Sequence, residues 1–233
     1  MRNYVIINGV NSNTITGLAI KELPPISKPL MRSDIEEIDG RDGDIITELG
    51  YSAYDKEMEI GLYGSFDINQ VISFFNKEGT ITFSDESNKY YKFKVLEQID
   101  FNRLLKFKEA TVVFHCQPFK YPVSETPITI SGETTVNNAG NIYAMPTLNI
   151  IGSGTIGITL NGTQIFSIDL GESTTPITID TAMMEAYNTS NTELMNRQVT
   201  GDYSLFKILS GNNTIEISGT VSQATISNYT RWL

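Results

Sequence analysis

The sequence predicts a mainly β protein built from two β-sandwich domains. Two observations predict this fold class. Short segments of alternating apolar and polar residues recur along the chain between Gly, Asn and Pro turns, which is the pattern of half-buried strands. The composition also changes near the middle, since 32 of the first 122 residues are charged but only 12 of the remaining 111 are.

The change in composition occurs at residues 112–122, which read VVFHCQPFKYP and form a strand that ends in two prolines. Ser, Thr and Asn rise from 22 residues before this point to 41 after it. Two parts with different surfaces on either side of a proline-bounded junction indicate two domains. We therefore expect one domain over residues 1–123 and a second over residues 124–233.

The first domain is expected to contain one hairpin and one helix among its strands. Residues 35–38 and 45–51 flank a polar loop with two glycines, which predicts a hairpin. Ile68, Val71, Ile72 and Phe75 recur at helical spacing, so we expect a helix over residues 67–79, capped by Asp67 and ended by Gly79. The strands expected in this domain are residues 4–7, 18–23, 35–38, 45–51, 56–63, 80–83, 90–99 and 106–116.

The second domain is expected to be almost purely β. Asn161-Gly162 lies between two apolar-alternating segments and is a strong signal for a tight hairpin. Residues 181–198 are ambiguous, because their methionines suit a helix whereas residues 188–191 would break it, and we interpret them as a hairpin. The strands expected here are residues 127–130, 146–151, 155–160, 164–170, 176–180, 205–209, 214–218 and 224–227.

Charge and cysteine content exclude several functions. The net charge is −10 without any basic tract, so tight binding to nucleic acid is not expected. A single cysteine, Cys116, cannot build an intrachain disulfide framework. The first residues are too polar for a signal peptide, and no apolar run approaches the roughly 20 residues of a membrane span, so we expect a protein made in the cytoplasm and soluble there.

No organised catalytic site can be recognised. His115 and Cys116 are neighbours on a strand, so their side chains point to opposite faces, and Cys116 is expected to be an inert core thiol. The acidic loop at residues 39–44 could suggest calcium, but it lacks the spacing of an EF-hand. No nucleophile elbow, zinc-protease motif, P-loop or dinucleotide fingerprint is present. We expect no enzymatic activity, no cofactor and no metal.

Several short stretches, taken in order, resemble one protein family. In the first part they are Gly40-Arg41-Asp42-Gly43, Leu49-Gly50-Tyr51, Ile81-Thr82-Phe83-Ser84-Asp85, Tyr90-Tyr91-Lys92 and residues 113–121, VFHCQPFKY. In the second they are Asn138-Ala139-Gly140-Asn141 with Pro146, Gly152-Ser153-Gly154, Asn161-Gly162, Ile179-Asp180, Gly211-Asn212-Asn213-Thr214-Ile215 and Arg231-Trp232-Leu233. This ordered set resembles the distal tail (Dit) proteins of siphophages.

The resemblance implies a structural protein of the virion tail. The first domain would be a tail-tube-like sandwich with one short helix, and the second a galectin-like sandwich projecting outward. Six copies would form a ring that joins the tail tube to the tail-tip or receptor-binding apparatus. Its partners would be the tail tube protein, a tail-associated lysin or tip protein and a receptor-binding protein. DNA would pass through the ring without tight binding, and no membrane would be involved.

The hairpin of residues 35–51 is the best candidate for a contact between subunits, because a permanent ring needs long hairpins or arms. Its alternating charges could set the register between copies. An ordinary solvated hairpin is the alternative. The candidate interface residues are Arg32, Asp34, Glu36, Asp39, Arg41, Asp42 and Asp44.

A second hypothesis is a carbohydrate-binding module of a host-attachment protein. It requires a groove with aromatic and polar groups on the outer sandwich. A terminal Trp232 could stack on a sugar ring, although a tryptophan at a chain end is more often a core or interface residue.

Overall fold

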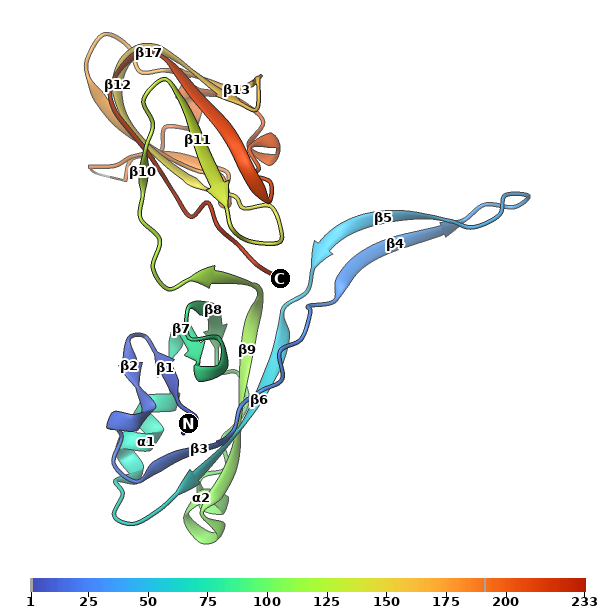
Figure 1. Cartoon of the computed structure of the whole chain (residues 1–233), viewed down its shortest axis with the longest axis vertical. Helices are drawn as coiled ribbons and strands as arrows, with labels where there is room; N and C mark the ends of the chain where they lie inside the picture. Colours follow the sequence, from blue (N-terminus) through green and yellow to red (C-terminus); the bar gives the residue numbers. More distant parts are fainter. Residues whose placement is uncertain (1, 191) are drawn as a thin grey trace. The chain divides into compact units, whose positions relative to one another are not determined.

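The computed structural model describes residues 2–190 and 192–233. Its contacts divide the chain into two compact units, with the division between Val123 and Ser124. Each unit is mainly β (Figure 1), so the predicted fold class is confirmed. Within the described ranges, no helix is long and apolar enough to cross a membrane.

The first unit is built on one antiparallel sheet of seven strands in the order β2-β1-β7-β8-β9-β6-β3. The long strand β9 joins its two halves: residues up to Cys116 pair with β6, and residues from His115 onward pair with β8. The strands are β1 (Val5–Ile7), β2 (Val10–Asn11), β3 (Leu18–Glu22), β6 (Tyr54–Leu62), β7 (Glu78–Phe83), β8 (Lys89–Lys94) and β9 (Glu109–Pro122).

Alternate residues of β9 enter the core of this unit. Phe114 is fully buried, and its ring lies 5.4 Å from that of Phe93, 6.2 Å from Phe83 and 6.4 Å from Phe75. Cys116 is on the same buried face, so it is the core thiol that the alternation predicts. Burial raises the pKa of this thiol to about 12, which keeps it protonated and unreactive at neutral pH.

The predicted helix is present as α1 (Ile68–Phe75). Asp67 caps it, because its carboxylate accepts a hydrogen bond of 2.9 Å from the backbone N–H of Asn69. The helix ends at Phe75, four residues before the predicted end at Gly79. Gly79 instead belongs to β7, where its φ of +135° and the side chain of Asn8 leave no room for a Cβ.

A second helix, α2 (Phe101–Phe107), was not predicted. Asp100 caps it through a hydrogen bond of 2.9 Å from the backbone N–H of Arg103, and Lys108 ends it at φ +61°. The strand predicted from residue 106 is therefore wrong at its start, since β9 begins at Glu109. Only Leu104 of this helix is fully buried, so α2 lacks the repeated apolar spacing by which longer helices are recognised in a sequence.

The second unit is a sandwich whose two layers share their longest strands. The first half of β12 pairs with β14 and with the end of β17, whereas its second half pairs with β13 and with the start of β17. The strands are β10 (Ile128–Thr129), β11 (Glu133–Asn138), β12 (Thr147–Leu160), β13 (Thr163–Asp169), β14 (Thr175–Asp180), β15 (Glu185–Asn188), β16 (Val199–Gly201) and β17 (Gly211–Ser227). The described residues of the two units also form four short 3₁₀ helices: Ser12–Thr14, Ser84–Glu86, Asn196–Gln198 and Tyr203–Leu205.

The second unit contains one of the predicted hairpins and lacks one of the predicted strands. The hairpin at Asn161-Gly162 is confirmed, since both residues have positive φ between β12 and β13. A hairpin between β14 and β15 turns at residues 181–184, within the ambiguous stretch, although Asn191 of that stretch lies outside the described residues. The strand predicted at 205–209 is wrong, because Leu205 ends a 3₁₀ helix and Ile208 forms an isolated bridge with Ala144.

The last residues of the second unit are fixed by a close backbone approach. A Cβ on Gly140 would lie 1.8 Å from the carbonyl oxygen of Arg231. Asn138 accepts hydrogen bonds from the backbone N–H groups of Gly140 (2.8 Å) and Arg231 (3.4 Å). The Arg231 side chain donates to the Tyr143 carbonyl (2.8 Å), so the C-terminal segment is part of this unit's packing.

Candidate functional site

The candidate site is a hairpin, here called the arm, that comprises residues 31–51. Its strands β4 (Met31–Glu37) and β5 (Asp44–Tyr51) pair only with each other in the described chain and form a separate two-stranded sheet. The arm extends away from the sheet of the first unit (Figure 1). Its hairpin prediction is confirmed, and its register places Ile35 opposite Ile46 and Glu37 opposite Asp44.

The structure does not bring the seven predicted interface residues to one place. Arg32, Asp34 and Glu36 alternate along β4 and share one face, because side chains two residues apart point the same way. Asp44 is on the other face, opposite Glu37. Asp39, Arg41 and Asp42 are in the turn at the tip. All seven are exposed, and none takes part in an ion pair within the described chain.

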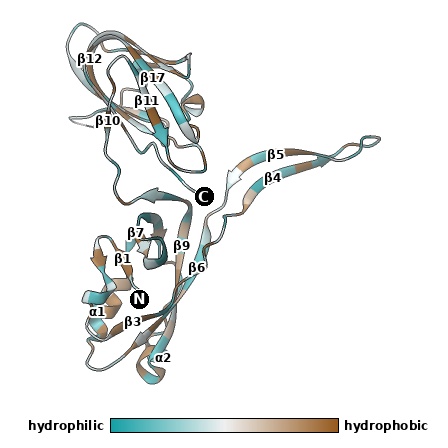
Figure 2. Cartoon of the chain, viewed as in Figure 1, coloured by the Kyte–Doolittle hydropathy of each residue, from teal (hydrophilic) through white to brown (hydrophobic). Residues whose placement is uncertain are grey.

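The arm also exposes apolar side chains, which are not among the seven predicted interface residues. Ile35 is 57% exposed and its cross-strand partner Ile46 is 61% exposed. Figure 2 shows hydrophobic and hydrophilic stretches alternating along β4 and β5. An isolated two-stranded hairpin is marginally stable in water, and burying one such isoleucine would contribute about 1.5–3 kcal/mol. The arm therefore has the chemistry of a segment that packs against another surface.

The root of the arm, here the segments 23–30 and 52–53 that join it to β3 and β6, is held to β6 by two side chains. Lys56, which is 3% exposed, donates a hydrogen bond of 2.9 Å from its Nζ to the carbonyl of Pro25. The hydroxyl of Tyr54 donates to the carbonyl of Ser27 at 3.4 Å. Both acceptors belong to the segment that leads from β3 into β4, so β6 fixes where the arm leaves the sheet.

An aromatic and charged cluster surrounds this root. The Nζ of Lys56 lies 4.9 Å from the centroid of the Tyr91 ring and 5.3 Å from that of Tyr54. Burial lowers the pKa of Lys56. Nearby Glu86 is partly buried, which raises its pKa, but hydrogen bonds from Lys89 and Lys120 outweigh burial and hold the pKa below its ordinary value. The charges of this cluster are therefore compensated by aromatic rings and ion pairs.

The remaining sequence candidates do not form a reactive site. His115 lies 2.7 Å from Asp55, Nδ1 to Oδ1, on a half-exposed face away from Cys116. Within the described residues, no group of three or more His, Cys, Asp or Glu side chains could hold a metal ion. Trp232 is half-buried.

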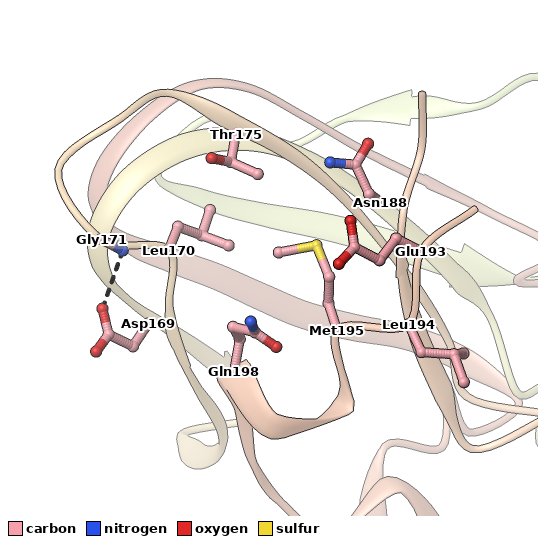
Figure 3. Close-up of a pocket in the computed structure, with 9 residues that line it drawn as sticks. All are labelled: Asp169, Leu170, Gly171, Thr175, Asn188, Glu193, Leu194, Met195 and Gln198. Atoms are coloured by element: carbon pink, nitrogen blue, oxygen red, sulfur yellow. Dashed lines mark hydrogen bonds between the residues drawn. The ribbon is translucent and has the colours of Figure 1, made fainter. Parts of the chain in front are cut away.

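The second unit contains a hollow of about 520 Å³ (Figure 3). The carboxylate of Asp169 at its edge is engaged by the backbone N–H of Gly171 at 3.1 Å. The lining consists of Asp169, Leu170, Gly171, Thr175, Asn188, Glu193, Leu194, Met195 and Gln198. These residues include no aromatic ring, so this hollow lacks the stacking surface that the carbohydrate hypothesis requires.

Comparisons with known proteins identify the fold. No protein-family model matches the sequence, and no curated protein sequence matches it. Similar solved structures include two phage proteins. One is phage SPP1 Dit (gp 19.1), described as a paradigm of the hub adsorption apparatus in phages that infect Gram-positive hosts, with a TM-score of 0.73 and 18% identity over 100% of both chains. The other is a chain of the phage P2 baseplate in its activated conformation with Ca, with a TM-score of 0.51 and 12% identity over 97% of each chain.

The resemblance found in the sequence predicted this result. The similarity to SPP1 Dit includes both units, so neither unit alone accounts for it. The chain therefore has, over its whole length, the fold of a siphophage distal tail protein.

Proposed function

We propose that this protein is a structural component of a phage tail, a ring of six copies that joins the tail tube to the tail-tip or receptor-binding apparatus. The observation that supports the proposal most directly is the arm, which pairs with no other strand of the described chain and exposes Ile35 and Ile46 beside charges that form no ion pair there. A closed ring requires one patch of each copy to fit a different patch of the next. An arm that leaves its own sheet suits such a contact.

The remaining features agree with a structural role. The protein is acidic, which suits a channel through which DNA must pass without binding. The partners would be the tail tube protein, a tail-associated lysin or tip protein and a receptor-binding protein. The second unit, which would be a galectin-like outer domain, carries only three basic residues and would face those tip proteins. The protein would have no catalytic activity and would reside in the virion tail.

The first experiment measures oligomeric state by light scattering behind size exclusion, followed by negative-stain imaging. We expect a particle of six times 25.9 kDa with a central hole. A protein that remains monomeric at high concentration and also in the presence of its tail tube protein would contradict the ring.

A truncation separates the roles of the two units. Deleting residues 124–233 should leave ring formation intact and abolish attachment of the tip proteins. Loss of the ring in the truncated protein, with its first unit still folded by circular dichroism, would argue against this division of roles.

The carbohydrate-binding hypothesis makes a different prediction. It requires saturable binding of the intact protein to a glycan array, reduced by substitutions in the hollow of Figure 3, such as Glu193→Gln. The proposed structural role predicts no such binding.

A further inference from the structure

A basic surface on α2 has the chemistry to receive the arm. Phe107 on this helix is 61% exposed, whereas six other aromatic side chains of the unit are buried in its core. Arg103 and Lys106 lie beside it on the same short helix, and the Lys106 ammonium is 5.2 Å from the Phe107 ring centroid. They line a hollow of about 610 Å³ together with Asp100, Asn102 and Glu109.

The two acidic residues of this α2 surface are already engaged. Asp100 caps the helix by accepting a hydrogen bond from the backbone N–H of Arg103. Glu109 forms an ion pair of 2.8 Å with Lys21, and its other oxygen lies 3.9 Å from Arg103. Lys106 has no ion-pair partner in the described ranges. The α2 surface therefore presents an aromatic ring beside two cations.

One face of the arm is complementary to the α2 surface. The register places Ile35 opposite Ile46, Glu37 opposite Asp44 and Ser33 opposite Glu48, so these residues share a face, here called the Ile face. It presents two exposed isoleucines beside three carboxylates and no basic residue. Glu37 and Asp44 are like charges directly opposite each other, which disfavours the isolated hairpin and would be relieved by a cationic partner.

The arm and the α2 surface of one chain lie too far apart to meet. The arm leads into the first residue of β6, Tyr54. The helix α2 comes just before β9, whose first residue, Glu109, pairs with Gly61 at the other end of β6. Nine residues of extended strand span about 30 Å. The arm also points away from its own sheet (Figure 1). A contact between these two surfaces must therefore join two copies.

We propose that the Ile face of the arm docks on the α2 surface of a neighbouring copy, with Ile35 and Ile46 against Phe107 and with Glu37 and Asp44 paired to Arg103 and Lys106. This inference rests on the proposed ring and names the acceptor surface of its subunit contact. The contact is head-to-tail, because the two patches differ, and it can therefore close a ring.

Complementary charge reversals test the pairing. The arm variant Glu37→Lys/Asp44→Lys and the helix variant Arg103→Glu/Lys106→Glu should each be monomeric under conditions where the unaltered protein forms rings. Mixed in equal amounts, they should recover hexamers that contain both chains in alternation, because each reversed arm meets a reversed acceptor. The control Asp34→Lys/Glu36→Lys makes the same charge change on the opposite face of the arm and should leave rings intact.

Each result decides the inference. Rings that persist in both reversed variants would overturn the docking surface while leaving the ring itself established. Loss of rings in both variants without recovery on mixing would also overturn the pairing, provided that circular dichroism shows both chains folded.

Cross-linking tests the contact even if the unaltered protein is monomeric, so the docking inference and the ring can fail separately. Under oxidising conditions, Ile46→Cys mixed with Phe107→Cys should give a covalent heterodimer, whereas Thr47→Cys on the opposite face should not. Native Cys116 is fully buried and would not compete. Absence of the Ile46–Phe107 cross-link at high concentration would overturn the docking surface.

Discussion

The Nζ of Lys56 donates a hydrogen bond of 2.9 Å to the carbonyl of Pro25, which ties the segment that precedes the arm to β6, the strand that follows the arm. Lys56→Met keeps the length of the side chain and removes this bond. We expect faster amide exchange at the root, notably at Ser52, whose N–H donates to the carbonyl of Leu30 at 2.9 Å. Exposed Lys92→Met is the matched control, and equal exchange in both variants would show that Lys56 does not hold the root.

The thiol of Cys116 should make the free energy of unfolding depend on pH in the alkaline range. Its pKa is raised by burial from 9.0 to about 12, so the unfolded chain loses the proton first as pH rises. The unfolding free energy should therefore be unaffected by this group below pH 9 and should fall between pH 9 and 12, by about 1.4 kcal/mol at pH 10. Denaturant titrations of the protein and of Cys116→Ala should diverge in this direction, and parallel pH profiles would contradict it.

Isoleucines of the arm and of the core should respond differently to truncation. Ile46→Ala removes an exposed side chain, so the stability of the monomer should change by less than about 0.5 kcal/mol, while ring formation weakens. Ile60→Ala removes a fully buried side chain and should cost about 2–5 kcal/mol in the first unit. Chemical denaturation of the two variants measures both values, and a large loss in the Ile46→Ala monomer would mean that the arm packs on its own chain.

Gly140 should not tolerate a side chain. Because its Cβ would lie 1.8 Å from the Arg231 carbonyl oxygen, Gly140→Ala should displace the C-terminal segment and cost about 1–3 kcal/mol in the second unit. Ala139→Ser, at the exposed neighbouring position, is the control. Calorimetry of both variants checks the prediction, and equal melting temperatures would contradict it.

Elements with a clear local signal were predicted from the sequence, whereas those fixed by pairing were not. Asp67 and the stripe at Ile68, Val71 and Phe75 identified α1, and Asn161-Gly162 identified a hairpin, because caps and turns act over a few residues. The helix α2 was missed because it has two turns and one fully buried residue. The strand predicted from Lys106 overlapped the end of this helix, because the strong β pattern of the residues after it was extended too far back.

The candidate site was also predicted only in part, because part of it depends on strand pairing. The two glycines at the tip identified the hairpin, and its charges drew attention to Arg32, Asp34 and Glu36. Which residues share a face depends on the register, and the bulge between Arg32 and Ser33 shifts it in a way that no local pattern reveals. Exposure of Ile35 and Ile46 could not be predicted, because the same alternation in a larger sheet would place them in a core.

The long strands β12 and β17 have a mechanical consequence for the second unit. Because both strands pair in each layer, a load applied to one layer would be carried into the other along a continuous backbone. The sandwich should therefore melt as a single cooperative block. A unit of this kind would transmit a pulling or twisting force between its ends with little internal deformation.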